Sequence, residues 1–192
     1  TVTTGTGDIN LTGIETSANS STYAVLLYTA TTAGNLVSTS GNINIDASTT
    51  GTETGFGVSR SSATTAIQTG GNVSILADKY SFSSNYAISA TGSLTLATKT
   101  GVTLGIGPGS GSTVNISTAN LGNFTAGSYV FGSTASGDLT VNTTKDFADK
   151  NVSFISGQDI TLSGNLTTGW QAFTPTLKKI TVDIMTSVDE LI

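Results

Sequence analysis

The chain has 192 residues, with seven lysine or arginine residues, twelve aspartate or glutamate residues, and no histidine or cysteine. Without histidine and cysteine the chain has no Cys/His zinc site, Ser-His-Asp triad, thiol nucleophile or disulfide framework. The formal charge of −5 disfavours binding to the negatively charged backbone of nucleic acid, so no nucleic-acid partner is expected. The longest apolar run, residues 23–28, is far shorter than a membrane span, so no membrane-spanning segment is expected.

The composition predicts an ordered, all-β chain. Leucine, isoleucine, valine and phenylalanine total 47 residues, above the share of about 20% below which disorder is expected. Threonine, valine and isoleucine are β-branched and suit a pleated surface. Glycine, asparagine and serine suit tight turns. We therefore expect many short strands.

A unit of glycine, polar, apolar, polar and apolar residues recurs along the chain. Its period of two places the apolar side chains on one face of a strand. In chain order the units and their variants occupy residues 7–11, 41–45, 71–75, 92–96, 101–104, 112–116, 137–141, 151–155, 157–162 and 164–167.

The spacing of these units predicts a parallel β-helix, which is a solenoid of short stacked strands. A second apolar element precedes some units, at residues 66–69, 86–91 and 128–131. Neighbouring units are 19 to 34 residues apart, and a coil of about 20 residues with insertions is typical of this fold. Glycine and asparagine at the corners are expected to allow sharp bends and left-handed backbone. The long spacing at residues 53–65 is expected to be a loop.

An antiparallel sandwich or barrel is the alternative fold, because its strands would also recur at short intervals. That fold predicts Asn-Gly or Asp-Gly hairpin turns. The chain contains neither dipeptide, since the order is always Gly-Asn or Gly-Asp. This order favours the β-helix.

The segment SGDLTVNTTKDFADKNVSFISGQDITLSGNLTTG, residues 136–169, carries a resemblance to a known family. It resembles the shaft repeats of filamentous haemagglutinin-like exoproteins and related autotransporter passengers, and the likeness extends over residues 1–168. The resemblance implies a right-handed parallel β-helix on a bacterial surface that contributes to adhesion. The family's secretion domain carries Asn-Pro motifs, whereas neither Pro108 nor Pro175 follows an asparagine here.

The acidic residues do not form a recognisable catalytic pattern. Asp8 and Asp138 occupy the same turn position of their units, which favours a corner role. Asp146 and Asp149, with a lysine on either side, are interpreted as a solvated loop. The glycine-rich residues 105–111 lack a lysine and are interpreted as a turn rather than a phosphate loop. We therefore expect no enzyme activity, metal or cofactor.

Ice binding is a second alternative, because some threonine-rich β-helices align Thr-x-Thr pairs on one flat face. Such pairs fall here at unrelated points of the repeat, at residues 1 and 3, 29 and 31, 52 and 54, and 98 and 100. A regular array is therefore not expected.

Eight asparagines stand in Asn-x-Ser/Thr sequences, the acceptor pattern for N-glycosylation. Strand alternation also produces this pattern, because an outward asparagine is followed two positions later by another outward polar residue. The candidates for a glycoprotein are Asn10, Asn19, Asn72, Asn115, Asn123, Asn142, Asn151 and Asn165.

The pattern changes after residue 168, so residues 1–168 are predicted as the repeat domain and 169–192 as an atypical C-terminal segment. Residues 178–184 alternate as a strand, and residues 187–190 have the spacing of a capping box that could begin a short helix. This segment either caps the open end of the solenoid or contacts the next subunit. The candidate residues for both roles are Trp170, Phe173, Ile180, Val182 and Ile184.

These observations predict a secreted or cell-surface structural protein of adhesive type, without enzyme activity. Its expected partner is a host or neighbouring-cell surface, including glycans, contacted through a Thr/Ser/Asn-rich face. Exposed aromatics such as Tyr23, Tyr28, Tyr80 and Tyr86 are candidates for that contact, although half of them are expected to pack inside. The alternative function is a self-assembling subunit of an extracellular filament or surface layer.

Overall fold

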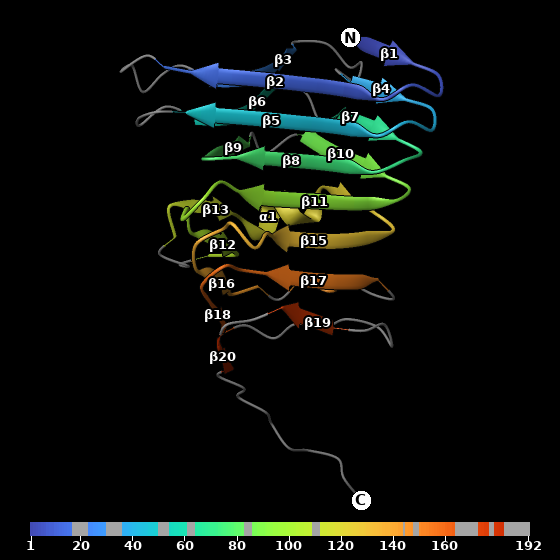
Figure 1. Ribbon diagram of the computed structural model, residues 1–192. Helices are drawn as coiled ribbons and strands as arrows, with labels where there is room; N and C mark the ends of the chain where they lie inside the picture. The colour runs from blue at the N-terminus through green and yellow to red at the C-terminus, as the bar shows by residue number, and fades with distance from the viewer. Residues whose placement is uncertain are drawn as a thin grey trace, which may run out of the picture.

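The chain is mostly β, and its strands form four sheets in which neighbouring strands are parallel (Figure 1). The computed structural model describes residues 1–16, 23–29, 36–49, 54–60, 64–82, 86–108, 112–143, 145–147, 150–163, 173–176 and 179–182. Parallel pairing excludes the antiparallel sandwich and barrel, because hairpins would pair neighbouring strands in opposite directions.

Two of the sheets, named here sheet A and sheet B, begin with the first two strands of the chain. Sheet A has the order β1 (Val2–Thr4), β4 (Leu36–Ser38), β7 (Thr64–Thr69), β10 (Tyr86–Ala90) and β14 (Phe124–Thr125). Sheet B has the order β2 (Ile9–Glu15), β5 (Ile43–Thr49), β8 (Val73–Ala77), β11 (Ser93–Thr98), β15 (Ser128–Gly132), β17 (Asn151–Ile155) and β19 (Phe173–Thr176).

The other two sheets lie in different parts of the chain. Sheet C, in the N-terminal half, has the order β3 (Tyr23–Thr29), β6 (Thr54–Arg60) and β9 (Tyr80–Phe82). Sheet D, in the C-terminal half, has the order β13 (Val114–Ile116), β12 (Leu104–Ile106), β16 (Leu139–Val141), β18 (Asp159–Leu162) and β20 (Lys179–Val182).

The order in which the chain visits the sheets changes at its middle. Through the first nine strands the chain passes from sheet A to B to C and then back to A. After β11 it enters sheet D, and from β15 onward it alternates between sheets B and D. Sheet B is therefore the sheet to which both halves of the chain contribute strands, and these strands lie one above another in Figure 1.

The core lies against the inner face of sheet B, where paired residues form two columns. The strand registers align the first column as Ile9, Ile43, Val73, Leu94, Tyr129 and Val152. They align the second as Leu11, Ile45, Ile75, Leu96, Phe131 and Phe154. Apart from the half-buried Leu11, all of these residues are buried. The predicted alternation of the units is thus confirmed.

The unit glycines are needed for close packing between successive strands rather than for left-handed backbone. A Cβ on Gly41 would lie 2.1 Å from the carbonyl oxygen of Gly7, and one on Gly71 would lie 2.7 Å from that of Gly41. Among the described glycines, only Gly101, Gly107 and Gly132 have positive φ. The expectation of left-handed corners is therefore wrong for most units, because what they require is the absence of a side chain.

Two predicted loops contain strand residues. Residues 54–60 of the expected loop at 53–65 form β6, which pairs with β3 and β9. The side chain of Phe56 is fully buried, so this strand contributes to the hydrophobic core and is not a surface loop. The glycine-rich turn at 105–111 likewise begins in strand β12, because Gly105 and Ile106 pair with Thr140 and Val141.

A short helix, α1 (Thr118–Gly122), was not predicted. Its N-cap is Ser117, whose side chain accepts a hydrogen bond from the backbone N–H of Asn120. Leu121 is fully buried, so the helix closes over the core between β13 and β14. The five residues are too few to give a periodic pattern in the sequence.

The C-terminal segment adds one strand to each of two sheets. β19 pairs with β17 so that Phe173 and Pro175 stand opposite Val152 and Phe154. β20 pairs with β18, and this confirms a strand within residues 178–184. Trp170, Ile184 and the expected helix at 187–190 lie outside the described residues. The role of the segment as cap or connector stays a prediction.

Candidate functional site

A ladder of polar side chains links the turns that precede successive strands of sheet B. The Asp8 carboxylate accepts a hydrogen bond from the backbone N–H of Asn42 at 2.6 Å. The Asn42 side-chain oxygen accepts from the backbone of Asn72 at 3.0 Å, and that of Asn72 accepts from the backbone of Ser93 at 2.8 Å. In sheet D the Asp138 carboxylate accepts from the backbone of Asp159 in the same way. The predicted corner role of Asp8 and Asp138 is confirmed.

A second set of side-chain hydrogen bonds lies at the end of sheet A, where a buried serine or threonine hydroxyl precedes the unit glycine. The Ser38 hydroxyl donates to the carbonyl oxygen of Gly7 at 3.1 Å and accepts from the N–H of Gly41 at 2.9 Å. The Thr69 hydroxyl donates to the carbonyl of Gly41 and accepts from the N–H of Gly71. Each hydroxyl therefore joins its own turn to the turn about thirty residues earlier.

The outer face of sheet B carries a column of small, mostly polar and uncharged side chains. The strand registers align Asn10, Asn44, Ser74, Thr95, Val130 and Ser153. Asn10 and Asn44 are exposed and the others are half-buried. The Asn44 amide donates to the Asn10 side-chain oxygen at 2.9 Å. Since strands repeat at about 4.8 Å, this column is a regular polar strip on the outside of the molecule.

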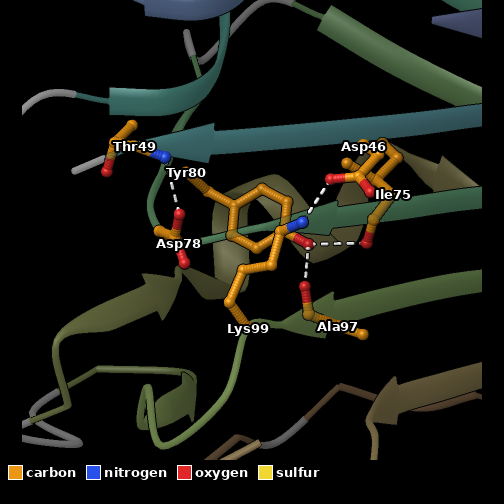
Figure 2. A network of polar contacts seen from close by, with 7 residues as sticks. All are labelled: Asp46, Thr49, Ile75, Asp78, Tyr80, Ala97 and Lys99. Atoms are coloured by element: carbon orange, nitrogen blue, oxygen red, sulfur yellow. Dashed lines mark hydrogen bonds and ion pairs between the residues drawn. The ribbon is translucent and has the colours of Figure 1, made fainter. Parts of the chain in front are cut away.

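Charged residues gather at the far end of the N-terminal strands of sheet B (Figure 2). Lys99 forms an ion pair with Asp46, and the Asp78 carboxylate accepts from the backbone N–H of Thr49 at 2.6 Å. The Tyr80 hydroxyl lies 2.7 Å from the carbonyl oxygens of both Ile75 and Ala97. Burial raises the pKa of Tyr80 well above the ordinary range of tyrosine. This tyrosine therefore joins β8 to β11 as a neutral hydrogen-bond donor.

Two of the four tyrosines considered for binding lie in the core. Tyr80 is 8% exposed and Tyr86 is 1% exposed. Both belong to an aromatic cluster in which Phe82 stacks on Tyr86 with ring centroids 4.8 Å apart. These two are therefore not surface contacts, in line with the expectation that half would be internal. Tyr23 is half-buried, and the side chain of Tyr28 lies outside the described residues.

The six described glycosylation candidates occupy different surroundings. Asn10, Asn72, Asn115 and Asn151 are exposed, and Asn123 and Asn142 are half-buried. The Asn72 side chain belongs to the turn ladder, and the Asn142 amide donates to the carbonyl of Pro108 at 2.8 Å. Asn19 and Asn165 lie outside the described residues. Glycosylation at any of these positions stays a prediction.

The loop around Asp146 packs against the core through its aromatic residue, Phe147. Asp146 is exposed, whereas Phe147 is 2% exposed and meets the Tyr129 ring with centroids 5.0 Å apart. Lys145 lies over the Phe147 ring at 5.5 Å, and partial burial lowers the pKa of this lysine. Asp149 lies outside the described residues. In the part of the chain that the structure describes, no three His, Cys, Asp or Glu side chains gather as a metal site.

Comparisons with known proteins give no match: no family model, curated protein or solved structure is similar to this chain. Among the described residues, no helix has the length and apolar character needed to cross a membrane.

Sequence reasoning missed the ordered columns of the outer face, although it identified the residue types that form them. The unit pattern places Asn10, Asn44 and Ser74 on the outer side of their strands. Only the strand registers place the three residues side by side.

Proposed function

We propose that the chain is a right-handed parallel β-helix that serves as a non-enzymatic structural and adhesive part of a bacterial secreted or cell-surface protein. The observation that carries this proposal is the outer face of sheet B. Its residues, from Asn10 through Ser74 to Ser153, form a continuous strip of small side chains along parallel strands. A regular strip with little charge suits shallow polar contacts with a neutral glycan or another cell-surface molecule.

The path of the chain supports the β-helix. Successive strands of sheet B are parallel, and the chain between them passes through another sheet each time. Such crossover connections between parallel strands are nearly always right-handed. A progressive winding also stacks the glycines of successive units, as Gly41 lies against the carbonyl of Gly7.

The adhesive role is supported by the resemblance of residues 136–169 to filamentous haemagglutinin-like repeats. The acidic net charge of −5 disfavours anionic partners such as nucleic acid. We therefore propose an extracellular location and a partner on a host or neighbouring cell, with neutral glycans as the first class to examine.

The proposal is tested by attachment of beads that carry the purified chain to a panel of cells and to arrayed glycans. The double variant Asn44→Lys/Ser153→Lys places two charges on the outer face of sheet B. We expect it to lose attachment at least tenfold, because each lysine would disrupt close contact with a neutral surface.

The matched control is Gln68→Lys/Thr125→Lys, which places the same charges on exposed positions of sheet A. It should attach as the unmodified chain does, and circular dichroism should show that both variants are folded. Equal attachment of the two double variants, or no attachment of the unmodified chain to any surface, would contradict the adhesive role.

The alternative is a self-assembling subunit of an extracellular filament or surface layer. It is favoured by one observation: among the described strands β20 pairs only with β18, and the end strand of a sheet can pair with a further strand. Electron microscopy separates the two functions, because isolated rods favour the adhesive segment and regular polymers favour the subunit. Deleting residues 177–192 separates cap from connector, since loss of folding indicates a cap and loss of assembly alone indicates a connector.

A further inference from the structure

Sheet A has an internal end in the middle of the chain. β14 pairs with β10 through Ile88 and Phe124 and is the last described strand of this sheet. The strands β15 to β20 follow it in the chain and extend sheets B and D, but none of these described strands joins sheet A. The side of β14 that faces away from β10 is named here the β14 edge. It results from the path of the chain, which stops adding strands to one sheet while it continues the others.

Two backbone groups point to the β14 edge. The N–H of Ile88 donates to the carbonyl of Asn123 at 3.2 Å, so this carbonyl points toward β10. In a parallel strand, alternate residues direct their N–H and C=O groups to opposite neighbours. The carbonyl of Phe124 and the N–H of Ala126 therefore point away from β10. They are the acceptor and the donor that one residue of a further parallel strand would use.

The hydroxyl of Tyr129 takes the place of that residue. It donates to the carbonyl of Phe124 at 3.0 Å and accepts from the N–H of Ala126 at 3.2 Å. Tyr129 belongs to β15 of sheet B, so its side chain extends across the core to reach sheet A. Because one hydroxyl both donates and accepts, it reproduces the pair of hydrogen bonds that joins parallel strands. The β14 edge is therefore closed by a side chain instead of a strand.

The place of this tyrosine in the repeat supports a specific role. Tyr129 stands in the first inner column of sheet B. The other members of that column are all aliphatic, and they are Ile9, Ile43, Val73, Leu94 and Val152. Another aliphatic residue would serve the packing of the core alone. The one hydroxyl of the column occurs beside the last described strand of sheet A, where backbone groups need a partner.

Neighbouring rings hold Tyr129 in this position, whereas the strand that it closes reaches the surface. The Tyr129 ring stacks on Phe131 with centroids 6.2 Å apart and meets Phe147 edge-on at 5.0 Å. On the outer side of the same wall, Thr125 and Gly127 are exposed. Loss of the tyrosine would therefore leave two unpaired backbone groups close to solvent, and an unpaired strand edge is a place where another strand can add.

We propose that the β14 edge is an acceptor site for one parallel strand of a second copy of this chain, and that Tyr129 keeps the site closed. The incoming strand would direct one N–H to Phe124 and one C=O to Ala126, in place of the tyrosine hydroxyl. This inference depends on the parallel sheets and not on the adhesive role.

The strands of sheet A in a second copy have the pattern that this site requires. The residue opposite Phe124 has to be apolar, because the aligned residues Leu36, Ile67 and Ile88 are all buried. The next residue has to be polar, because Thr125 faces outward. β7 supplies such a pair in residues 67–68, and β10 supplies one in residues 88–89.

A synthetic peptide with the sequence of residues 64–71, which contains β7, is labelled with a fluorophore as the probe. Tyr129→Leu opens the site, because it removes the hydroxyl and the end of the ring and introduces the residue type of Leu94 in the same column. By fluorescence anisotropy the peptide should bind this variant at least about tenfold more tightly than the unmodified chain, as expected for two hydrogen bonds gained. Bound peptide should also slow hydrogen exchange at the amide of Ala126.

Two further variants separate opening of the site from loss of stability. The matched control Phe131→Leu removes a fully buried neighbouring ring but leaves both hydrogen bonds of Tyr129 in place. It should bind the peptide as weakly as the unmodified chain does. Tyr129→Phe removes the hydroxyl alone, so it should speed hydrogen exchange at Ala126 and bind with intermediate affinity. This variant also tests the proposal if Tyr129→Leu does not fold.

The proposal is overturned if the unmodified chain, or Phe131→Leu, binds the peptide as tightly as a folded Tyr129 variant does. It is also overturned if no folded Tyr129 variant binds the peptide at millimolar concentration. Sedimentation tests the second copy as the partner. Association of Tyr129→Leu that exceeds that of the unmodified chain, and that the peptide inhibits, would support it. Association that is equal in both chains, or that the peptide does not inhibit, would contradict it.

Discussion

The two halves of the molecule use the same sequence unit to build different surroundings for one shared sheet. In the N-terminal half, β2 to β11 of sheet B are accompanied by sheets A and C. In the C-terminal half, β15 to β19 are accompanied mainly by sheet D. Sheet B runs through both halves, and its strands keep a parallel register across the change. The unit therefore specifies a strand and its inner face, but not the sheet that lies opposite.

The cores of the two halves differ in the same way. The second inner column of sheet B is aliphatic at Ile75 and Leu96 and becomes aromatic at Phe131 and Phe154. Phe147 adds a further ring from outside the strands, with its centroid 6.0 Å from that of Phe131. Sheet A has no described strand after β14, and the rings of Tyr129, Phe131 and Phe147 pack against one another beside this part of sheet B. Both halves therefore contain ring clusters, but only in the C-terminal half do rings belong to the inner columns of sheet B.

The largest expected effect comes from removing the ring that supports the C-terminal half. Phe147→Ala should lower the free energy of unfolding by about 4 kcal/mol, because it removes a buried aromatic side chain and leaves a cavity. Hydrogen exchange should show the loss in β15 and β17, while β5 and β8 stay protected. Lys150→Ala, at an exposed position nearby, is the control. A uniform loss over both halves would show that they do not differ in the way described.

The N-terminal half should be most sensitive at its turns. Gly41→Ala would place a methyl group 2.1 Å from the Gly7 carbonyl oxygen, so the turns must separate. We expect a loss of about 3 kcal/mol in urea unfolding followed by circular dichroism. Gly5→Ala is the matched control, because a Cβ there meets nothing within 4 Å. Similar midpoints for the two variants would contradict close packing as the reason for the unit glycine.

The sequence predicted the strands of the units because their alternation is local. The inner positions of units such as those at residues 43–45 and 73–75 are buried as expected. The ladder role of Asp8 could also be predicted, because its position repeats. By contrast, the unit at 137–141 has the same pattern as that at 7–11 but lies in sheet D instead of sheet B. The choice of sheet depends on the connecting segments, which carry no repeated signal.

The remaining misses also depend on contacts between distant residues. Residues 53–65 were interpreted as a loop because they lie in a long spacing between units, yet the ring of Phe56 in β6 packs against that of Phe82 with centroids 6.0 Å apart. The outer column of sheet B depends on strand register, which joins residues about thirty positions apart. Local alternation fixes which face a side chain takes, whereas the neighbours on that face follow from the complete winding of the chain.

Two buried tyrosines should respond oppositely to loss of the hydroxyl. The Tyr86 hydroxyl, in the N-terminal half, has no hydrogen-bond partner in the described part of the chain. The Tyr129 hydroxyl, in the C-terminal half, donates to the carbonyl of Phe124 at 3.0 Å and accepts from the N–H of Ala126. Tyr86→Phe should therefore stabilise by about 1 kcal/mol and Tyr129→Phe should destabilise by about 1 kcal/mol at pH 7. Urea unfolding measures both, and equal signs would contradict the assignment.

Tyr86 also limits the stability of the N-terminal half at alkaline pH. Burial raises the pKa of Tyr86 above its ordinary value of 10.0, so the folded chain retains a proton that the unfolded chain loses. The contribution of this tyrosine to the free energy of unfolding is fully present below pH 10. It is lost as the pH rises above 10, by about 1.4 kcal/mol per pH unit. Tyr86→Phe should make the decline above pH 10 shallower. An unchanged slope in pH-dependent urea unfolding would contradict this linkage.

The smallest expected difference between the halves is in their response to salt. In the N-terminal half, Lys99 and Asp46 form an ion pair that is partly exposed, so Lys99→Met should cost about 0.5 kcal/mol at low salt. In the C-terminal half, Asp138 and Asp159 are both exposed and place like charges at neighbouring rungs of the ladder. Asp159→Asn should therefore stabilise by about 0.5 kcal/mol. Both effects should vanish near 1 M NaCl, where charges are screened within about 3 Å. A salt-independent effect of Asp159→Asn would contradict charge repulsion as its cause, because the variant keeps the backbone N–H that donates to Asp138.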